Sequence, residues 1–414
     1  MQRVALALCI ITLAGCSKMP AISPLPGTSQ PATRTNSRSA FQILHVFQST
    51  KNGRVPVGTL LALNGMLYGT TNFGGDSSKR CYPGVGCGTV FKLSSASNEK
   101  TLYRFNGNAD GTRPYAGLVD VHGTLYGTTQ SGGKHNEGAV FALTTSGMEH
   151  TIWAFNGKDG SDPRAGLTSD SSGAVYGTTY YGGKVGIGTV FAIGPSGTEK
   201  VLHSFQGGSD GSKPLGTLIN VNNVLYGTTS FGGAKNAGTV FSVNTDGTNY
   251  TVLYSFRAGK GDGAFPFAGL RELNGTLYGT TEEGGAYNKG TVFAISSSGS
   301  ESVIHSFGGS GDGGEPFAGL TVLNGTLYGT TAYGGSGPDV SPNDIKRRPA
   351  GEGTIYTISP SGSERVLHAF TGGPGGRVPY ANLTAMKGSL YGVTIWGGNK
   401  GLTGGEGTVF EYTP

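Results

Sequence analysis

The sequence has 414 residues, of which 76 are glycine; only 13% are charged, and the formal net charge is +5. Glycine follows no period of three, which excludes collagen, and apolar and aromatic residues recur too regularly for a disordered chain. Glycine combined with Tyr, Phe, Val and Thr predicts many short strands joined by tight turns. Basic residues form no clustered face, so no nucleic-acid partner is expected.

The chain begins with a segment typical of a secretory signal. Residues 1–15 combine Arg3 with an apolar stretch over residues 4–13, which is too short to span a membrane. The segment runs into Leu-Ala-Gly-Cys, ending at Cys16, which resembles the signal of bacterial lipoproteins. That resemblance implies lipidation of Cys16 and export to the cell envelope, with the outer membrane favoured in a Gram-negative cell. The alternative is an ordinary secretory signal in which Cys16 is incidental.

Residues 16–40 are rich in Ser, Pro and Thr and have no apolar period. Such a composition predicts a flexible tether, with an end-to-end distance of about 27 Å for a random coil of this length. The globular part is therefore assigned to residues 41–414, held close to a membrane by the lipid.

Three short phrases recur in the same order seven times. Leu-Tyr-Gly-Thr-Thr is followed by a diglycine, then by Gly-Thr-Val-Phe or a close variant, then by an apolar run ending in Phe. A proline and an Ala-Gly-Leu-like segment precede each tyrosine. The tyrosines are Tyr68, Tyr126, Tyr176, Tyr226, Tyr278, Tyr328 and Tyr391.

Each repeat predicts four strands: A from the Ala-Gly-Leu segment onward, B at Leu-Tyr-Gly-Thr-Thr, C at Gly-Thr-Val-Phe, and D ending in Phe. Asn64-Gly65 and equivalent pairs between A and B predict two-residue type I′ hairpins. A four-stranded meander cannot bury both of its faces alone. The sequence therefore predicts an all-β fold, a seven-bladed β-propeller of four-stranded antiparallel blades.

The two ends of the repeat indicate how the ring closes. The repeat region begins with a D strand at Ile43 to Phe47 and ends with a C strand at Gly407 to Tyr412. The simplest arrangement is that the N-terminal strand completes the last blade, which removes exposed sheet edges. We expect such a closed ring to be a monomer.

These phrases together resemble the choice-of-anchor tandem repeat GloVer-containing proteins of bacteria, over about residues 41–412. The diglycine after strand B is also similar to the kelch propeller pattern. The resemblance implies a repeat domain joined to a surface-anchoring signal, which fits the lipoprotein motif. It implies no active site.

The D–A and B–C connections of a propeller usually emerge on one face, and the repeat is most irregular there. The B–C connection is expanded in blade 1 (Asp76 to Cys87), in blade 6 (Ser336 to Glu352) and slightly in blade 7. Insertions on one face of a repeat array often mark a binding face, although loops also tolerate insertions without function.

In five blades the residue before the diglycine is aromatic. Exposed rings at this position would be stacking platforms for sugars, whereas the commoner role of such rings is packing between blades. Trp396 and Tyr333 flank the variable loops and are the best candidates for ligand contact; His135 is the one histidine in a B–C loop. The aromatic residues are Phe73, Tyr181, Phe231, Tyr333 and Trp396.

Other chemically active residues are better explained by structure. Asp-Gly recurs in five D–A loops, where Asp suits a turn. Histidine shares one strand D position with Tyr and Trp, which indicates packing. Cys81 and Cys87 predict a local disulfide in an exported protein. We assign no catalytic residue, no metal and no cofactor.

Three functions remain open from the sequence. The first is a non-enzymatic, surface-anchored binding module for glycan or envelope-protein ligands. The second is a polysaccharide-active enzyme, a glycosidase or lyase, with acid and base among Asp162, Asp262 and Glu315. The third is a purely structural envelope protein.

Overall fold

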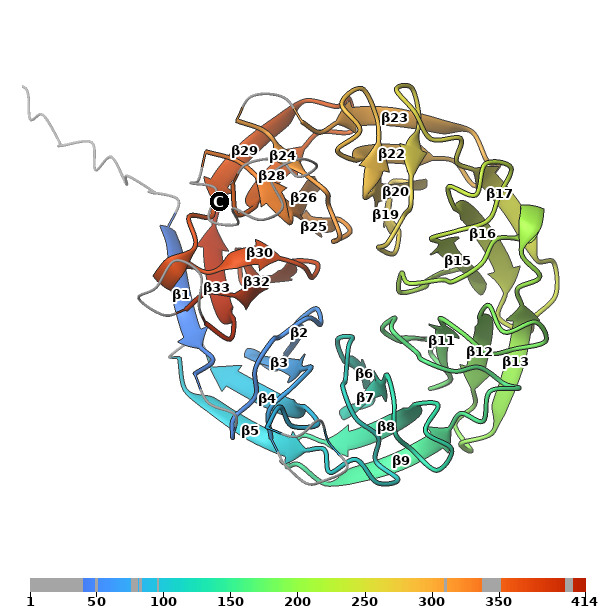
Figure 1. Cartoon of the computed structure of the whole chain (residues 1–414), viewed down its shortest axis with the longest axis vertical. Helices are drawn as coiled ribbons and strands as arrows, with labels where there is room; N and C mark the ends of the chain where they lie inside the picture. Colours follow the sequence, from blue (N-terminus) through green and yellow to red (C-terminus); the bar gives the residue numbers. More distant parts are fainter. Residues whose placement is uncertain are drawn as a thin grey trace, which may run out of the picture. The chain divides into compact units, whose positions relative to one another are not determined.

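The computed structural model describes residues 40–48, 51–75, 81, 84–94, 97–308, 311–336, 351–398 and 405–414. They form seven antiparallel blades arranged in a ring around a central axis (Figure 1). The predicted all-β, seven-bladed propeller of four-stranded blades is confirmed. The expected signal peptide, Cys16, the tether up to residue 39 and most of the blade 6 insertion lie outside the described residues.

Within each blade, strand A lies beside the axis and strand D at the rim. Blade 1 contains β2 (Leu61–Leu63), β3 (Met66–Thr71), β4 (Thr89–Ser94) and β5 (Glu99–Arg104). Blade 2 contains β6 (Val119–Val121), β7 (Thr124–Thr129), β8 (Ala139–Thr144) and β9 (Glu149–Ala154). Blade 3 contains β10 (Thr168–Ser169), β11 (Val175–Thr179), β12 (Thr189–Ile193) and β13 (Glu199–Ser204).

The same order continues around the ring. Blade 4 contains β14 (Ile219–Val221), β15 (Val224–Thr229), β16 (Thr239–Asn244) and β17 (Thr251–Ser255). Blade 5 contains β19 (Arg271–Leu273), β20 (Thr276–Thr281), β22 (Thr291–Ile295) and β23 (Glu301–Ser306). Blade 6 contains β25 (Thr321–Leu323), β26 (Thr326–Thr331), β28 (Thr354–Ile358) and β29 (Glu364–Ala369). Blade 7 contains β31 (Thr384–Met386), β32 (Ser389–Trp396), β33 (Thr408–Thr413) and β1 (Ala40–Val46).

Short elements in the loops complete the described structure. They are β18 (Gly263–Ala264), β21 (Glu283–Gly284), β24 (Gly313–Gly314), β27 (Tyr333–Gly334), β30 (Arg377–Pro379) and the 3-10 helices η1 (Gly208–Asp210) and η2 (Gly373–Gly375). Among the described residues, no helix is long and apolar enough to cross a membrane.

Six of the seven A–B hairpins have the predicted two-residue turn, whereas in blade 3 five residues separate Ser169 from Val175. Leu63 pairs with Met66, and the two residues between them, Asn64 and Gly65, have φ of 52° and 74°. Two successive positive φ angles define a type I′ turn.

Strand A itself begins later than expected. The Ala-Gly-Leu segment is a bend, and only two or three residues after it form the strand. Small residues are needed in the bend because neighbouring blades converge there: a Cβ on Gly117 would lie 2.2 Å from the Thr59 carbonyl oxygen. The prediction that strand A starts at Ala-Gly-Leu is therefore wrong.

The two threonines of Leu-Tyr-Gly-Thr-Thr form hydrogen bonds within a blade and to the next blade. Thr70 donates to the Ala116 carbonyl oxygen of the next blade at 2.8 Å. Thr71 bonds to Thr89 of strand C in the same blade, with 2.7 Å between the hydroxyl oxygens. The bond between blades recurs at Thr128, Thr228 and Thr280, whereas the hydroxyls of Thr178 and Thr330 have no partner among the described residues.

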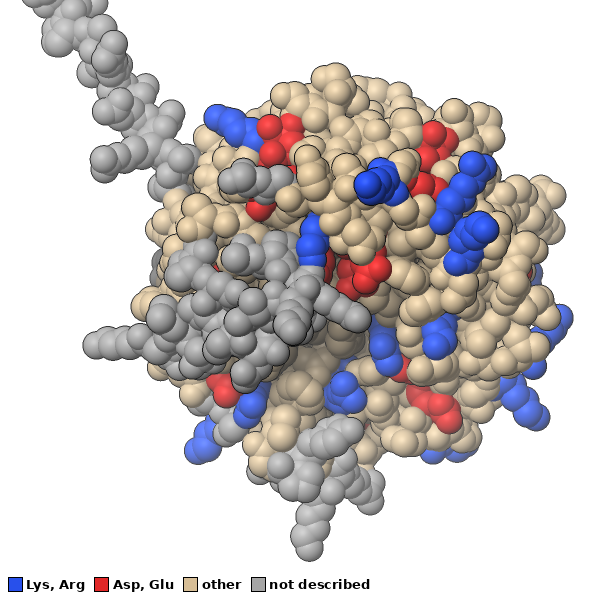
Figure 2. All heavy atoms as spheres, turned by 45° about the horizontal axis from the view of Figure 1, so that its top comes forward, with Lys and Arg blue, Asp and Glu red and all other residues tan. Residues whose placement is uncertain are grey.

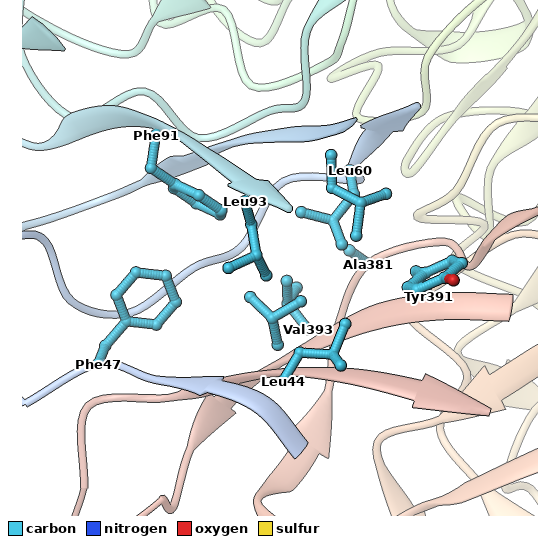
Figure 3. Packing of buried hydrophobic residues seen from close by; sticks show 10 residues of the cluster. Leu44, Phe47, Leu60, Phe91, Leu93, Ala381, Tyr391 and Val393 are labelled. Atoms are coloured by element: carbon cyan, nitrogen blue, oxygen red, sulfur yellow. The ribbon is translucent and has the colours of Figure 1, made fainter. Parts of the chain in front are cut away.

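The core lies between adjacent blades. At each of the seven interfaces the phenylalanine that follows a D strand packs edge-on against an aromatic ring of the next C strand, with ring centroids 5.0–5.4 Å apart. The interface between blades 7 and 1 is built in the same way: Phe47 contacts Phe91 beside Leu44, Leu60 and Val393 (Figure 3).

The first and last strands of the chain lie side by side. β1 pairs antiparallel with β33, with Ala40 opposite Thr413 and Val46 opposite Thr408. The pairing has a bulge at the position where every other C–D pair also has one. In Figure 1, β1 is the outer strand of blade 7.

Candidate functional site

The D–A and B–C loops of each blade meet at one face of the ring, here called the loop face. A two-residue antiparallel contact joins them in every blade. The pairs are Arg54 with Phe73, Thr112 with Ser131, Ser161 with Tyr181, Ser212 with Phe231, Ala264 with Glu283, Gly314 with Tyr333 and Arg377 with Trp396. The predicted aromatic positions are therefore fixed against the D–A loops.

The residue before each D–A proline has an unusual backbone. Its φ lies between 52° and 58° in all seven blades, a conformation that costs energy for a side-chain-bearing residue and is disfavoured before proline. A hydrogen bond from its N–H to a B–C carbonyl of the preceding blade, at 2.7–2.9 Å, holds it there. The residues are Val55, Arg113, Asp162, Lys213, Phe265, Glu315 and Val378. One backbone conformation therefore carries six residue types at these seven positions, of which the two valines are buried and the other five residues are partly exposed.

The residue after each D–A proline points to the axis and lines a small cavity, here called the axial pocket. The volume of this cavity is about 80 Å³. Tyr115 and Tyr380 bring their hydroxyl groups within 3.0 Å, Tyr380 stacks on Phe317 at 5.0 Å, and Phe317 contacts Phe267 at 5.4 Å. Four rings from blades 2, 5, 6 and 7 therefore surround one end of the axis beside Arg164, Leu215 and Val57.

Arg164 links the axial pocket to blade 3. It donates three hydrogen bonds of 2.6–3.1 Å to the Asp162 carboxylate, and its guanidinium carbon lies 4.1 Å from the centre of the Tyr180 ring. Burial alone lowers the pKa of Arg164, but the hydrogen bonds and charge of Asp162 outweigh it, so the pKa rises. The cation is fixed in place and stays charged.

The five aromatic residues before the diglycines are not part of the core. Tyr181 and Trp396 are each 38% exposed, and Phe73, Phe231 and Tyr333 are half-buried. None of the five belongs to a buried cluster between blades, although Phe231 contacts Phe265 of the next D–A loop with 5.4 Å between ring centroids. Tyr181 and Phe231 lie close together around Lys213, whereas Phe73 faces Arg113 at 5.6 Å.

The remaining sequence-predicted residues do not join this group. Trp396 ends β32 and Tyr333 begins β27, in blades 7 and 6. His135 is exposed in the B–C loop of blade 2. Cys81 and Cys87 form a disulfide with Cα atoms 5.0 Å apart, next to a cavity of about 190 Å³ between blades 1 and 2.

The carboxylates of the D–A loops have turn and rim partners. Asp110 accepts from the N–H groups of Asn106 and Asn108 and from the Tyr103 hydroxyl, as the turn interpretation of Asp-Gly requires. Asp262 has the same kind of contacts, Asp162 is bound to Arg164, and Glu315 lies 4.0 Å from Lys289. No carboxylate is among the described residues that line the axial pocket.

The strand D histidines are also explained by packing. His203 stacks on Tyr250 at 3.6 Å and contacts Asp210, and His368 stacks on Phe41 at 3.8 Å. Burial lowers the pKa of His368 to about 4, so this ring is neutral in the fold.

Lys213 and the seven residues after the D–A prolines that line the axial pocket were not singled out from the sequence. The residue after each D–A proline varies among Val, Tyr, Arg, Leu and Phe within an otherwise regular motif. Variation at one place of a fixed pattern was the available signal. Figure 2 shows that charged side chains are scattered over a largely uncharged surface, so charge alone does not mark the site.

Fold and loop face together define a seven-bladed propeller whose repeat builds a rigid frame and whose variable residues lie on one face. The chain belongs to the Gloeobacter/Verrucomicrobia repeat family, whose model matches residues 32–152 and 146–340. The sequence resemblance to the GloVer proteins is thereby confirmed.

Solved structures with a similar fold include an oligogalacturonate lyase from Vibrio parahaemolyticus, at 10% identity and a TM-score of 0.53, with 92% of this chain and 94% of that chain covered. A gluconolactonase from Xanthomonas campestris is 13% identical, with a TM-score of 0.39 and coverage of 67% and 79%. A chain of the nidogen/laminin complex is 16% identical, with a TM-score of 0.42 and coverage of 72% and 94%. At these identities the first likeness shows the propeller fold alone. No curated protein matches the sequence.

Proposed function

We propose that this protein is a non-enzymatic glycan-binding lipoprotein of the bacterial cell envelope, anchored through Cys16, with its binding site on the loop face. The axial pocket carries the proposal: Tyr115, Phe267, Phe317 and Tyr380 converge there beside the fixed cation of Arg164. Sites for small ligands combine apolar and aromatic walls with a few well-placed polar groups, and a cavity of about 80 Å³ would take the edge of one sugar ring while the rest of the glycan lies on the loop face. Aromatic rings offer flat apolar faces, and Tyr adds a hydroxyl group for the polar edge of a sugar.

The lining of the pocket favours binding over catalysis. Hydrolysis of a glycosidic bond ordinarily needs two carboxyl groups facing each other at the bond. Of the acid and base candidates suggested by the sequence, Asp162 is engaged by Arg164 and Asp262 by Tyr254, and Glu315 lies 4.0 Å from Lys289. A glycan held by aromatic stacking needs neither group.

The test is a glycan array probed with the full-length protein and with Tyr115→Ala. We expect binding by the wild type and a loss of at least about tenfold in affinity for the variant, because it removes a ring of the axial pocket. Tyr287→Ala is the control: that ring is 59% exposed on the B–C loop of blade 5, and its loss should leave affinity unchanged. An array without any bound glycan would overturn the proposal, and a pull-down from envelope extracts would then test the protein-ligand alternative.

The anchor is tested separately. Labelling of cells with a palmitate analogue should modify the wild type and not Cys16→Ser, and the variant should leave the membrane fraction. A Cys16→Ser protein that stays membrane-bound would contradict the lipid anchor.

A further inference from the structure

Lys213 lies on the loop face between blades 3 and 4, on a backbone that cannot shift easily. Its N–H donates to the Ile187 carbonyl of blade 3 at 2.9 Å, and its own carbonyl accepts from the Ser230 N–H of blade 4 at 3.2 Å. Its φ is 56°, the strained conformation shared by the residue before each D–A proline. Both backbone groups are therefore used to fix where the side chain starts.

Three aromatic rings surround the ammonium group. Its nitrogen lies 5.5 Å from the ring centre of Tyr180, 5.4 Å from Tyr181 and 5.3 Å from Phe231. Tyr180 and Tyr181 meet edge to face at 4.7 Å, and Phe231 packs on Phe265 at 5.4 Å. The rings thus support one another and hold the cation by attraction to their faces.

Lys213 differs from four other cations of this face in its partners. Arg54, Arg164, Lys289 and Arg377 each have a carboxylate oxygen within 4.0 Å. Within the described part of the chain, no carboxylate lies within that distance of Lys213. An ammonium group has three N–H donors, and ring faces satisfy them only weakly.

Next to this cation lies an exposed flat surface. Tyr181 is 38% exposed, and its ring is 5.4 Å from the ammonium nitrogen. A pyranose ring stacked on Tyr181 would bring a carboxylate on its edge toward Lys213. Tyr180 contacts both Lys213 and Arg164, so the surface continues from this position to the axial pocket.

We propose that the glycan bound at the loop face is acidic, with a uronic acid residue whose ring stacks on Tyr181 and whose carboxylate pairs with Lys213. This inference rests on the proposed function and names its ligand class. Arg164 is already neutralised by Asp162, whereas no described carboxylate pairs with Lys213, so Lys213 supplies a charge that can select an anion. The following sugar units extend along Tyr180 toward the axial pocket.

The test compares acidic oligosaccharides with neutral counterparts of the same backbone. Oligomers of alginate, polygalacturonate and hyaluronan, each with a carboxyl-reduced form, are titrated against the full-length protein. We expect the acidic form of at least one polymer to bind about tenfold more tightly than its reduced form, with a preference that weakens as salt is raised. Lys213→Met, which keeps the apolar stem between the rings, should abolish the preference.

Two control variants separate charge from packing. Lys213→Arg keeps a cation between the same rings and should retain the preference. Lys235→Met removes an exposed lysine from the B–C loop of blade 4 and should also retain it. Melting temperatures of all variants show that each is folded.

The outcomes distinguish this inference from the proposed function. Equal binding of acidic and neutral forms, a preference that survives Lys213→Met, or binding of neutral glycans alone overturns the acidic ligand while leaving glycan binding in place. Binding of neither form of any polymer, together with an empty glycan array, overturns both.

Discussion

At the scale of single residues, the repeat offers an internal comparison for buried polar groups. The second threonine of Leu-Tyr-Gly-Thr-Thr bonds to the threonine of Gly-Thr-Val-Phe in six blades, at 2.7–2.8 Å. Blade 2 has Ala139 in place of the threonine of Gly-Thr-Val-Phe, and the buried hydroxyl of Thr129 has no partner among the described residues. An unpaired buried hydroxyl is costly because it has lost its water.

The exception in blade 2 leads to a stability prediction. Ala139→Thr should restore the hydrogen bond of the other blades and raise the free energy of unfolding by about 1 kcal/mol. The reverse change, Thr189→Ala in blade 3, should lower it by about 1–2 kcal/mol, because it removes the hydroxyl that bonds to Thr179 and to the Asp159 carbonyl oxygen. Urea unfolding of both variants measures the effect. A destabilised Ala139→Thr would show that blade 2 has no room for the extra atoms.

At the scale of elements, strands with a repeated sequence were predictable and the residues between them were not. Strands B, C and D follow phrases whose alternation and turns are local. Strand A is set instead by the approach of neighbouring blades at the axis, which the sequence of one repeat does not contain. The ring of residues after the prolines was missed for the same reason: Tyr115 and Tyr380 lie far apart in the chain and meet only when the blades are assembled.

The aromatic candidates show the same limit. Tyr181 and Phe231 were recognised from their positions before a diglycine, but their common partner Lys213 belongs to a D–A loop with a different local pattern. The Asp-Gly turns and strand D histidines, in contrast, were interpreted correctly, because interchange with Asn, Gly, Tyr or Trp at equivalent positions indicates structure. Local chemistry could be predicted, but contacts between blades could not.

The D strands also carry glutamates at the blade interfaces. Glu199, Glu301 and Glu364 lie beside the D–A aspartate that precedes their own blade, and one carboxylate oxygen of each has no hydrogen-bond partner among the described residues. Burial, and then the charge of the neighbouring aspartate, raises the pKa of each glutamate to about 7.

These shifts predict a pH dependence of stability. The folded state binds these protons up to about pH 7, whereas the unfolded chain releases them near pH 4.5, the ordinary pKa of a glutamate. The stabilising contribution of these groups should therefore be fully present below about pH 4.5, fall as pH rises to about 7, and change little above that. Each glutamate is half-exposed, so screening limits the effect to about 1 kcal/mol per residue.

The measurement is urea unfolding at pH 5 and pH 8 for the wild type and for the triple variant Glu199→Gln, Glu301→Gln, Glu364→Gln. Glutamine resembles the protonated acid, so the variant should lose most of the difference between the two pH values. Equal pH differences in the two proteins would mean that the glutamates are solvated in solution.

At the scale of the whole molecule, the ring depends on the interface between blades 7 and 1, where the outer strand of blade 7 comes from the start of the chain. β1 contributes Leu44 and Phe47 to a cluster that includes Phe91 of blade 1 and Val393 of blade 7 (Figure 3). A ring gains the packing of a seventh interface only if this contact forms, and an open array would leave the edge of β33 unpaired.

The aromatic contact that closes the ring between blades 7 and 1 can be compared directly with the equivalent contact between blades 3 and 4. Phe47 packs on Phe91 with centroids 5.3 Å apart, and Phe205 packs on Phe241 at 5.4 Å; both Phe47 and Phe205 are buried. Phe47→Ala and Phe205→Ala should each cost about 3–5 kcal/mol, because each leaves a similar cavity at a blade interface. Urea unfolding of the two variants measures this. If Phe47→Ala costs much less than Phe205→Ala, the terminal strand does not hold the ring together, and the molecule in solution is an open array of blades.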